Sequence, residues 1–393
     1  MTSASGYAHN GGVALVIDSD QHLYESRDTW RAHIDPAHRD DALGIDDDEL
    51  GYPWVTWRGQ RLGLVDVQYP GKTTALGERH ERMRARKPPE SDYDDDLPRD
   101  YWDASARVEK LATMGVDEAV VFPNFGLLWE RKLDGDLPSL TANMTAWNRW
   151  CASVATDGRG KIHPVAHVTL RDTPWLLAEL ARLERDGVRL AMVAPALVDG
   201  RPLSHPDHDV IWRAFVEHGV RPVFHVADQR RPFDDAWYTD PPDAFVSTLD
   251  SVFLWTAAAL ACTDLILNGA LDRHPDLRIG IVELSAVWVP MFLMMLDGGS
   301  QFTANLNGRP LAELSMRPSE YFRRQVRVSS FSYELPARLI RQTGDLYMCC
   351  SDYPHSEGTA TPLADYTNAH TPIGPDEAPG LFGENVSLLL APR

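Results

Sequence analysis

The chain has 393 residues, a formal net charge of −19 and 44% hydrophobic residues. The negative charge argues against a nucleic-acid-binding protein, because neutralising phosphates requires a basic face. The composition is that of a soluble globular protein with enough apolar material for a large core. We therefore expect a small molecule, and not a nucleic acid, as the partner of this chain.

The sequence shows no signal peptide and no membrane span. Residues 1–12 are small and polar, without the basic start and apolar stretch of a signal peptide. The two most apolar runs, 252–263 and 286–296, are too short to cross a bilayer and are more typical of buried helices. The four cysteines form no C-x-x-C pair, which is typical of a reducing compartment. These features predict a cytoplasmic protein that does not bind membranes.

The first predicted element is a buried strand at Val13–Ile17, which runs on into Asp20 and His22. In a strand, residues i and i+2 point to the same side, so these two side chains can reach one point. Both are good ligands for a divalent cation. Alone, however, such a pair more often marks the polar end of a surface strand, so the rest of the chain decides its meaning.

Residues 26–102 are rich in proline, glycine, charge and aromatic side chains. A structureless loop of this length is unusual inside a compact domain, so we interpret the region as an irregular cap inserted after the first strand. Residues 54–62 are predicted to form a small hairpin within it. The expected organisation is a main domain of residues 1–25 and 103–393, with a cap of residues 26–102 over its mouth.

From residue 103 onward, strand-like and helical segments alternate. The predicted strands after the first are 119–123, 163–170, 189–194, 222–226, 278–284, 326–331 and 346–351. The predicted helices are 104–114, 140–155, 173–186, 205–218, 242–268, 271–274, 286–305, 334–342 and 384–390. This alternation predicts an α/β fold, a closed (β/α)8 TIM barrel, with a doubly wound open sheet as the alternative. No G-x-G-x-x-G motif follows a strand, which weakens a dinucleotide-binding interpretation.

Acids and histidines stand at the ends of four predicted strands. His225 lies in the fifth strand, Glu283 in the sixth, and Asp352 directly follows the eighth, in addition to Asp20 and His22 at the first. A barrel brings the carboxyl ends of its strands to one rim, where such barrels carry their function. Two imidazoles with one or two carboxylates suit Zn, Fe or Mn, and a remaining carboxylate can move protons.

With these residues the chain resembles the amidohydrolase superfamily, in its amidohydrolase 2 branch of ACMSD-like decarboxylases and hydrolases. The resemblance covers most of the chain except the cap. It depends on Ile17–His22, His225, Asp272–Arg278 leading to Glu283, Ser351–Gly358 and Gly383–Asn385. The S-D-Y-P-H-x-E-G stretch at Ser351–Gly358 is its most specific part.

The resemblance implies that one divalent metal ion (Zn, or Fe or Mn) is held by Asp20, His22, His225 and Asp352, without an organic cofactor. Members with an H-x-H motif have histidine where this chain has Asp20. After the sixth strand, where a catalytic histidine is frequent, this chain has Glu283, which could move protons, contact substrate or bind a second metal. The fourth strand contains no lysine, the residue that is carboxylated in binuclear relatives, which favours a single metal.

The remaining candidates are assigned by side-chain type and expected position. His355 is expected either to reach the substrate, as a catalytic residue with Asp352 and Glu283, or to bond to the backbone of a turn. The substrate-binding candidates are the aromatic or basic residues Trp54, Trp57, Tyr69, His167 and Arg230. Other arginines that could anchor a carboxylate are Arg58, Arg231 and Arg273. His163 and Trp288 are expected to pack in the core or at the rim.

These observations predict a metal-dependent hydrolase whose metal-activated water attacks an acyl carbon of an amide, ester, thioester or C–C substrate. The aromatic cap favours a bulky apolar or aromatic acid derivative. The alternative is a non-oxidative decarboxylase of an aromatic or unsaturated carboxylic acid, because it needs the same ligands. A non-catalytic barrel is a third hypothesis, which the full ligand set disfavours. The resemblance also implies a homodimer, with the helices after strands five and six as the possible interface.

Overall fold

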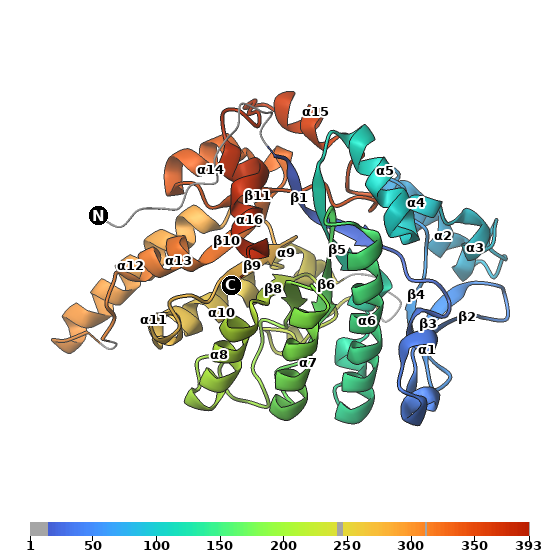
Figure 1. Ribbon diagram of the computed structural model, residues 1–393, viewed down its shortest axis with the longest axis horizontal. Coiled ribbons are helices and arrows are strands. Elements are labelled where there is room, and N and C mark those ends of the chain that lie inside the picture. Colours follow the sequence, from blue (N-terminus) through green and yellow to red (C-terminus); the bar gives the residue numbers. More distant parts are fainter. Residues whose placement is uncertain (1–14, 242–246, 311–312, 393) are drawn as a thin grey trace.

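Eight parallel strands form the centre of the computed structural model, which describes residues 15–241, 247–310 and 313–392 (Figure 1). In both chain order and spatial order, the strands are β1 (Ile17–Leu23), β5 (Glu118–Pro123), β6 (Ile162–His167), β7 (Leu190–Met192), β8 (Arg221–His225), β9 (Ile279–Val282), β10 (Val326–Ser330) and β11 (Tyr347–Cys349). Spatial order that follows chain order, with a helical connection after each strand, is the arrangement of a (β/α)8 barrel.

The barrel closes between β1 and the segment that follows β11. Gln21 and Tyr353 form a parallel bridge, the His22 N–H donates to the Tyr353 carbonyl at 2.8 Å, and the Asp352 N–H donates to the Asp20 carbonyl at 2.9 Å. This closure confirms the predicted TIM barrel and excludes the open sheet. It also holds Asp20 and Asp352, which are 332 positions apart, on neighbouring backbone segments.

The prediction for the first strand was wrong in its position. The strand spans Ile17–Leu23 and contains Asp20 and His22, whereas the apolar run at Val13–Ile17 contributes only its last residue. Leu15 is 45% exposed, and positions 13 and 14 lie outside the described residues. Polar residues occupy a buried strand here because they face the interior of the barrel rim and not solvent.

Helices surround the strands. They are α5 (Ala104–Met114), α6 (Leu137–Asp157), α7 (Thr173–Arg185), α8 (Asp209–His218), α9 (Thr248–Val252), α10 (Thr256–Leu267), α11 (Ala270–Arg273), α12 (Val289–Asn307), α13 (Pro318–Gln325), α14 (Pro336–Thr343), α15 (Pro362–Thr367) and α16 (Asn385–Leu390). Single turns of 3-10 or π helix lie at Pro36–Asp41, Phe125–Leu127, Glu130–Leu133, Pro206–His208, Asp235–Trp237, Ser332–Glu334 and Gly380–Glu384. None of the described helices is both long and apolar enough to cross a membrane.

Helix α5 shows why several predicted boundaries hold. Its bounds agree with the prediction, because Asp103 accepts a hydrogen bond from the Ala106 N–H at the start and Gly115 ends it at φ +73°. The predicted helix 242–268 is instead broken into α9 and α10 at residues 253–255, and positions 242–246 lie outside the described residues. Helix α13 was not predicted.

Two groups of apolar side chains make the core. The larger lies between the strands and the surrounding helices and includes the aromatic residues Trp147, Trp212 and Phe322. The smaller fills the barrel interior with residues such as Val120, Val223 and Met348, and it also contains Val386 and Leu389 of α16. Helix α16 lies across the strands in Figure 1 and closes their amino-terminal end. The open end is therefore the carboxyl-terminal one.

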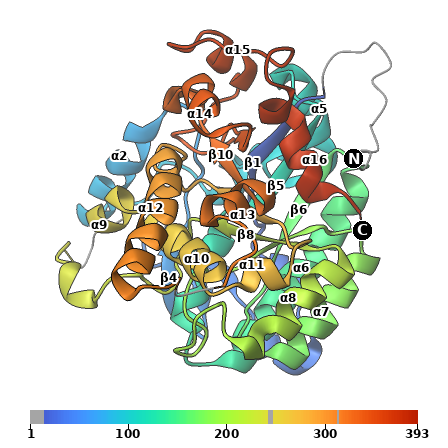
Figure 2. The same cartoon turned by 90° about the vertical axis from the view of Figure 1, so that its left-hand side faces the viewer.

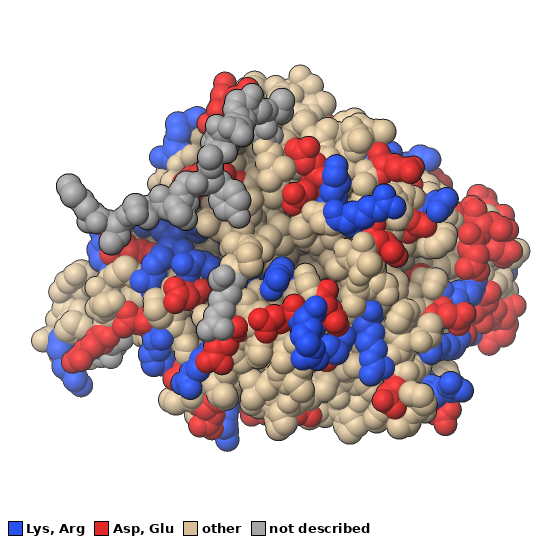
Figure 3. Space-filling model, in the orientation of Figure 1, with Lys and Arg blue, Asp and Glu red and all other residues tan. Residues whose placement is uncertain are grey.

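The cap (residues 26–102) is more regular than predicted. A three-stranded antiparallel sheet is formed by β2 (Gly44–Asp47), β3 (Pro53–Trp57) and β4 (Gln60–Leu64), so the predicted hairpin exists as part of a larger sheet. The helices are α1 (Thr29–His33), α2 (Thr73–Arg84), α3 (Tyr93–Asp96) and α4 (Arg99–Trp102). The cap occupies the right-hand side of Figure 1, and acidic side chains gather at that edge over α3 and β2 in Figure 3.

Candidate metal centre

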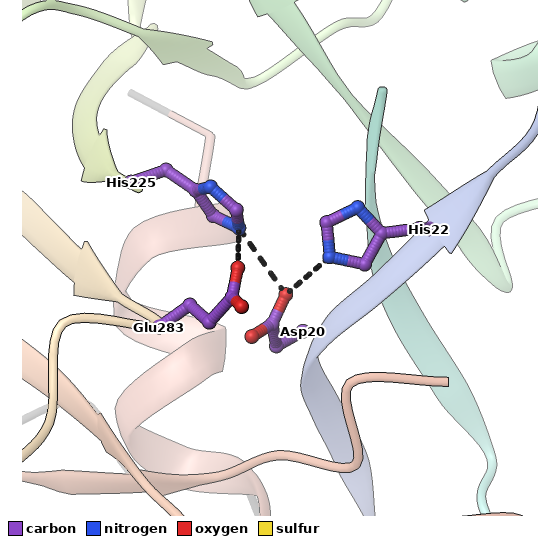
Figure 4. Close-up of side chains that lie close together, drawn as sticks. All are labelled: Asp20, His22, His225 and Glu283. Carbon is purple, nitrogen blue, oxygen red and sulfur yellow. Dashed lines mark ion pairs between the residues drawn. The ribbon is translucent and has the colours of Figure 1, made fainter. Parts of the chain in front are cut away.

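Five ionisable side chains meet at the carboxyl-terminal end of the barrel, and we call them the metal centre: Asp20, His22, His225, Glu283 and Asp352. The His22 Nε2 lies 3.4 Å from Asp20 Oδ1 and 3.2 Å from Asp352 Oδ1. The His225 Nε2 lies 3.5 Å from Asp20 Oδ1 and 3.3 Å from Glu283 Oε2 (Figure 4). The structure thus brings the four predicted metal ligands together, with Glu283 beside them.

Backbone geometry positions these side chains. Asp20 and His22 are two residues apart on β1 and therefore point to the same side. Glu283, directly after β9, and Asp352, three residues past the end of β11, adopt positive φ values of 55° each. Positive φ is unfavourable for residues with a side chain and persists where the surroundings enforce it, frequently at functional sites. Here the Glu283 N–H is held by Ser329 Oγ at 2.9 Å.

Both histidines are oriented by a bond from the ring nitrogen that faces away from the centre. The His22 Nδ1 lies 2.9 Å from the Pro123 carbonyl, and the His225 Nδ1 lies 2.7 Å from the Val226 carbonyl. Because a carbonyl can only accept, each Nδ1 carries the hydrogen. The two Nε2 atoms are then free to present lone pairs toward the carboxylates, as metal-binding histidines do.

The metal centre is buried and its polar atoms are unsatisfied. Asp20, His22, His225 and Asp352 are each at most 1% exposed. Both oxygens of Asp20, Oε2 of Glu283 and the Nε2 atoms of the two histidines have no hydrogen-bond partner among the described residues. Buried acids without a partner are strongly unfavourable, and a cation between these atoms would satisfy all of them. The donor set therefore fits a divalent metal ion with mixed nitrogen and oxygen ligands.

The pKa values of these side chains reflect the crowding of charge. Burial acts to raise the pKa of Asp20, but the His22 and His225 imidazoles hold it below its usual value. Burial acts to lower the pKa of His22, but Asp20 and Asp352 raise it well above the usual range. Burial raises the pKa of Glu283 well above its usual value, and the Asp352 and Asp20 carboxylates raise it further. A proton on His22 thus compensates charge where a metal ion would.

His355 joins the metal centre through Asp352. Its Nδ1 lies 2.7 Å from Asp352 Oδ1, its Nε2 lies 2.6 Å from Asn124 Oδ1, and its ring stacks on His22 with 3.9 Å between centroids. His355 is therefore a neighbour of the metal centre, and the contact with substrate expected for it stays a prediction. Asn124 was missed by the sequence analysis, although a polar residue directly after the predicted strand 119–123 was the signal that could have identified it.

Glu25 fixes the loop that carries Asn124. Its carboxylate accepts hydrogen bonds from the Phe125 N–H at 2.9 Å and the Gly126 N–H at 2.8 Å. The side chain is fully buried, and burial raises the pKa of Glu25 to about 7 even though these donors oppose the shift. A carboxyl group just after β1 thereby ties the first strand to the loop after β5, next to His355.

The predicted aromatic substrate contacts lie in the cap. Trp54 and Trp57 are on β3, where the Trp54 Nε1 donates to Asp48 at 3.0 Å and the Arg58 guanidinium lies 4.5 Å from the centre of the Trp57 ring. The Tyr69 hydroxyl donates to the Asp96 carbonyl at 2.7 Å. Within the described part of the chain, none of these three side chains forms a hydrogen bond or ion pair with the metal centre, so their role in substrate binding stays a prediction.

The cap nevertheless touches the loop that carries Asp352 and His355. The Ser356 N–H donates to Gln68 Oε1 at 3.0 Å, and the Gly71 N–H donates to the Ser356 carbonyl at 2.8 Å. The cap segment that contains Tyr69 therefore packs directly beside the metal centre. Gln68 was not considered in the sequence analysis, and nothing in its local pattern indicated this contact.

His167 and Arg230 lie at a second part of the rim. The His167 Nε2 lies 2.9 Å from Glu130 Oε2, and Arg230 is ion-paired with Asp134 at 2.8 Å. Arg230 borders a hollow lined by Glu130, Arg131, Asp134, Thr169, Leu170, Arg171, Ala194, Ala196, Leu197 and Val198. The other candidate anchors are also ion-paired: Arg58 with Asp41 and Asp136, Arg231 with Asp250, and Arg273 with Asp209. Their carboxylate-binding capacity is thus already used in part.

Of the two candidates expected to pack in the core or at the rim, Trp288 is buried, whereas His163 is partly exposed at the amino-terminal end of the barrel. His163 is on β6, and its Nε2 lies 2.7 Å from Glu118 Oε2 near the amino-terminal end of the barrel. Trp288 is 3% exposed, and its ring stacks against Trp255 with 5.8 Å between centroids. Neither contacts the metal centre.

Solved structures with a similar fold include an amidohydrolase and several decarboxylases. An amidohydrolase of Mycobacterium avium subsp. paratuberculosis K-10 is 24% identical with a TM-score of 0.74, over 98% of this chain and 100% of the other. The 5-carboxyvanillate decarboxylase of Sphingomonas paucimobilis is 17% identical with a TM-score of 0.62, over 97% and 100% of the two chains.

A third similar structure contains a metal ion. It is a 5-carboxyvanillate decarboxylase of Novosphingobium aromaticivorans with bound manganese and 3-methoxy-4-hydroxy-5-nitrobenzoic acid, 16% identical with a TM-score of 0.62, over 96% and 97% of the two chains. No protein-family model and no curated protein sequence matches the chain. The barrel described above is the fold that these amidohydrolase and decarboxylase structures share.

Proposed function

We propose that this chain is a divalent-metal-dependent enzyme of the amidohydrolase 2 branch, and that it removes CO2 from an aromatic or unsaturated carboxylic acid without oxidation. The observation that carries the proposal is the metal centre itself: buried carboxylates and two histidine Nε2 atoms that face one another without hydrogen-bond partners. A barrel with only a structural role gains nothing from such a cluster, because unpaired buried acids destabilise the fold.

Asp20, His22, His225 and Asp352 would hold the metal ion, which when bound would supply a positive charge for the substrate carboxylate and a neighbouring oxygen. Manganese is supported by the similar structure in which it is bound, while the mixed ligand set also suits zinc or iron. Glu283 stays outside this set of four. His355, which is itself bonded to Asn124, would hold Asp352 through its Oδ1.

The reaction needs one proton at the carbon that loses its carboxyl group. The C–C bond breaks, CO2 leaves without the bonding electron pair, and that pair takes up the proton. We assign this proton to the Glu283 carboxyl group, which lies beside His225 with Oε2 unpartnered among the described residues. The substrate acid releases its own proton to solvent, and a proton from solvent restores Glu283, so the net reaction, RCOOH to RH and CO2, consumes no water.

Decarboxylation is favoured over hydrolysis by the similar structures, since two of the three described above are decarboxylases of an aromatic acid. Aromatic side chains at the rim suit such a substrate: Phe331 and Tyr333, directly after β10, stack with 5.2 Å between ring centroids. Hydrolysis of an acyl compound is the second candidate. It is supported by the amidohydrolase structure with the TM-score of 0.74.

A reducing compartment is part of the proposal. The four cysteines are all buried and none forms a disulfide, which agrees with the cytoplasmic location predicted from the sequence.

Decarboxylation takes a hydrogen from solvent, whereas hydrolysis takes an oxygen, so isotopically labelled water distinguishes the two reactions. The enzyme loaded with Mn²⁺ is incubated with a panel of aromatic carboxylic acids and acyl thioesters, in D2O and separately in H2¹⁸O, and products are analysed by mass spectrometry. We expect CO2 release and one deuterium on the carbon that lost the carboxyl group. Incorporation of ¹⁸O into a new carboxylate without CO2 would instead identify a hydrolase.

Glu283→Gln provides the matched variant for this assay. We expect it to retain the metal ion, because the four proposed ligands are intact, and to lose activity, because the amide cannot donate an acidic proton. Full activity in Glu283→Gln would contradict the assignment of the proton donor but leave the metal centre in place.

A further inference from the structure

Three arginines face the inside of the barrel at its amino-terminal end, and we call them the arginine layer: Arg221, Arg278 and Arg327. They stand at the starts of the neighbouring strands β8, β9 and β10. Alternate residues of a strand point to the same side, and Val223 and Val282 belong to the apolar group inside the barrel. Arg221 and Arg278 therefore point inside as well. Branched apolar residues usually fill such a layer, so the arginines require an explanation.

Arg221 is buried, and its charge has no partner. The side chain is 9% exposed, and its Nε and Nη1 have no hydrogen-bond partner among the described residues. Burying a cation without a partner is strongly unfavourable, as it is for the unpaired acids of the metal centre. An anion beside Arg221 would compensate the charge and accept the unused hydrogen bonds.

The other two arginines are held in place but are not neutralised. The Arg278 Nη1 donates to the carbonyls of Pro275 at 2.8 Å and Leu277 at 3.1 Å. The Arg327 Nε donates to Asn385 Oδ1 of α16 at 2.7 Å. These acceptors are uncharged, and within the described ranges no ion pair joins the arginine layer to a carboxylate. Because a guanidinium has five N–H donors, both side chains keep donors for a ligand.

The three positive charges lie close enough to repel one another. Burial lowers the pKa of Arg221, and the charge of Arg278 lowers it further. Burial also lowers the pKa of Arg327, and Arg278 again adds to the shift. Asp276 opposes the shift at Arg221, and Asp345 opposes it at Arg327, but both have the smaller influence. This end of the barrel is thus locally positive, in a chain of net charge −19.

The arginine layer lies at the end of the barrel opposite the metal centre. Arg221 and His225 are the first and last residues of β8, about 13 Å apart along the strand. Figure 2 shows the barrel from the side, with α16 of the amino-terminal end at the right and α9, which follows β8, at the left. In Figure 3 the amino-terminal end faces the viewer, and basic side chains gather over α13 beside it. A small anion on the arginine layer would therefore not reach the metal ion.

We propose that the arginine layer binds a phosphate group at the amino-terminal end of the barrel. A guanidinium presents parallel N–H groups that match two oxygens of a phosphate. A phosphate group carries a charge of about −1.5 to −2 near pH 7, so it compensates more of the three positive charges than a single carboxylate does. The proposal does not depend on the reaction at the metal centre.

Calorimetric titration with inorganic phosphate tests the proposal on the protein with its metal ion bound. Phosphate is varied from about 10 µM to 10 mM, which covers weak and moderate affinities, and chloride keeps the ionic strength constant. We expect one phosphate per chain. Arg221→Gln and Arg278→Gln should each bind phosphate at least about 10-fold more weakly, because each loses a charged donor. Arg317→Gln, whose side chain is 72% exposed beside α13, is the matched control and should bind like the wild type.

His225→Ala separates the arginine layer from the metal centre. This variant should lose the metal ion and still bind phosphate with the affinity of the wild type. Loss of phosphate binding in His225→Ala, with full binding in Arg221→Gln, would place the phosphate on the metal ion and overturn the proposal. A wild-type chain that binds no phosphate would overturn it as well.

Thermal unfolding gives a second measurement and shows that each variant folds. A ligand that binds only the folded chain raises its melting temperature. We expect 10 mM phosphate to raise the melting temperature of the wild type, relative to chloride of equal ionic strength, and to leave that of Arg221→Gln unchanged. An equal rise in both proteins would contradict a site at Arg221.

Two further ligands identify the source of the phosphate group. Phenyl phosphate that binds at least as tightly as inorganic phosphate would indicate a phosphorylated metabolite, and weaker binding would indicate the free ion. Citrate carries only carboxylates. Tighter binding of citrate than of both phosphates would overturn the choice of phosphate.

Discussion

Histidine and carboxylate side chains lie together at both ends of the barrel, but their surroundings are opposite. At the amino-terminal end, the His163 imidazole and the Glu118 carboxylate lie 2.7 Å apart and are 22% and 25% exposed. At the carboxyl-terminal end, His22 and His225 face Asp20 at 3.4 and 3.5 Å, fully shielded from water. One pair is satisfied and solvated, and the other set is buried and unsatisfied.

What surrounds each end explains the difference. The amino-terminal end is filled by Val386 and Leu389 of α16, and Asn385 donates to Asp345 at 3.0 Å and accepts from Arg327 at 2.7 Å. The polar groups of Asn385, Asp345 and Arg327 have partners and hold the fold. At the start of β8, the Nε and Nη1 of Arg221 have none among the described residues. The carboxyl-terminal end keeps buried acid oxygens without a hydrogen-bond partner among the described residues, and a bound cation would compensate their charge. Substitutions should therefore affect stability at one end and metal binding at the other.

The largest effect is expected from Asp352→Asn or His225→Ala at the carboxyl-terminal end. Loss of a residue that merely orients a metal ligand lowers affinity or activity about 10- to 100-fold, so loss of a ligand should exceed 100-fold. Metal content by plasma mass spectrometry and kcat/KM should fall together. If either variant keeps its metal content and its kcat/KM at the wild-type level, metal binding does not distinguish the carboxyl-terminal end from the amino-terminal end.

At the amino-terminal end, the largest effect should come from Leu389→Ala. Leu389 is 3% exposed and sits against β9, where its Cδ1 lies 3.3 Å from the position of a Cβ at Gly280. We expect a loss of about 2–4 kcal/mol in the free energy of unfolding, from lost burial and the cavity left behind. Urea denaturation measures this loss, and kcat/KM at a temperature where the variant is folded should stay unchanged. A large loss of activity in the folded variant would show that the two ends are coupled.

Glu25 allows a test by pH, because it lies between the metal centre and the cap. Burial raises the pKa of Glu25 from 4.5 to about 7 in the folded protein. Between these values the folded chain keeps a proton that the unfolded chain has lost. The stabilising contribution is therefore complete below the unfolded value and is lost as the pH rises through about 7.

We compare the free energy of unfolding of Glu25→Gln and the wild type at pH 5 and at pH 8. The free energy of unfolding of Glu25→Gln, relative to that of the wild type, should be about 3 kcal/mol higher at pH 8 than at pH 5, because glutamine cannot ionise. Glu90→Gln, whose side chain is 81% exposed, is the control and should show no such shift. If the free energies of unfolding of the wild type and Glu25→Gln change with pH in parallel, burial does not raise the pKa of Glu25.

The smallest effect is expected from His163→Gln. The pair with Glu118 is partly solvated, and partly exposed ion pairs contribute about 0–1 kcal/mol. Metal content and kcat/KM should equal those of the wild type, and the melting temperature should fall by only a few degrees. Loss of the metal ion in this variant would mean that the His163–Glu118 pair at the amino-terminal end also supports metal binding.

Much of the barrel could be predicted from the sequence because its signals are local. Alternation of apolar strands with helices gave all eight strands, and glycines such as Gly115 marked helix ends. The first strand was misplaced because its interior face is polar: the metal ligands themselves, Asp20 and His22, replace the apolar pattern. The residues that break the rule of an apolar buried strand are thus those of the metal centre.

The parts of the site that could not be predicted depend on contacts distant in sequence. Asn124 meets His355 across 231 positions, and Gln68 meets Ser356 across 288. No local spacing encodes such pairs. The positive φ angles of Glu283 and Asp352 are likewise imposed by their neighbours, since neither residue type favours that conformation as glycine does.

Calorimetric titration of the metal-free protein with Mn²⁺ tests the central claim, with His225→Ala as the comparison. The geometry of Asp20, His22, His225 and Asp352 predicts one ion bound per wild-type chain, with release of a proton from His22, and no comparable binding to the variant. Equal binding to both proteins, or none to the wild type, would contradict it.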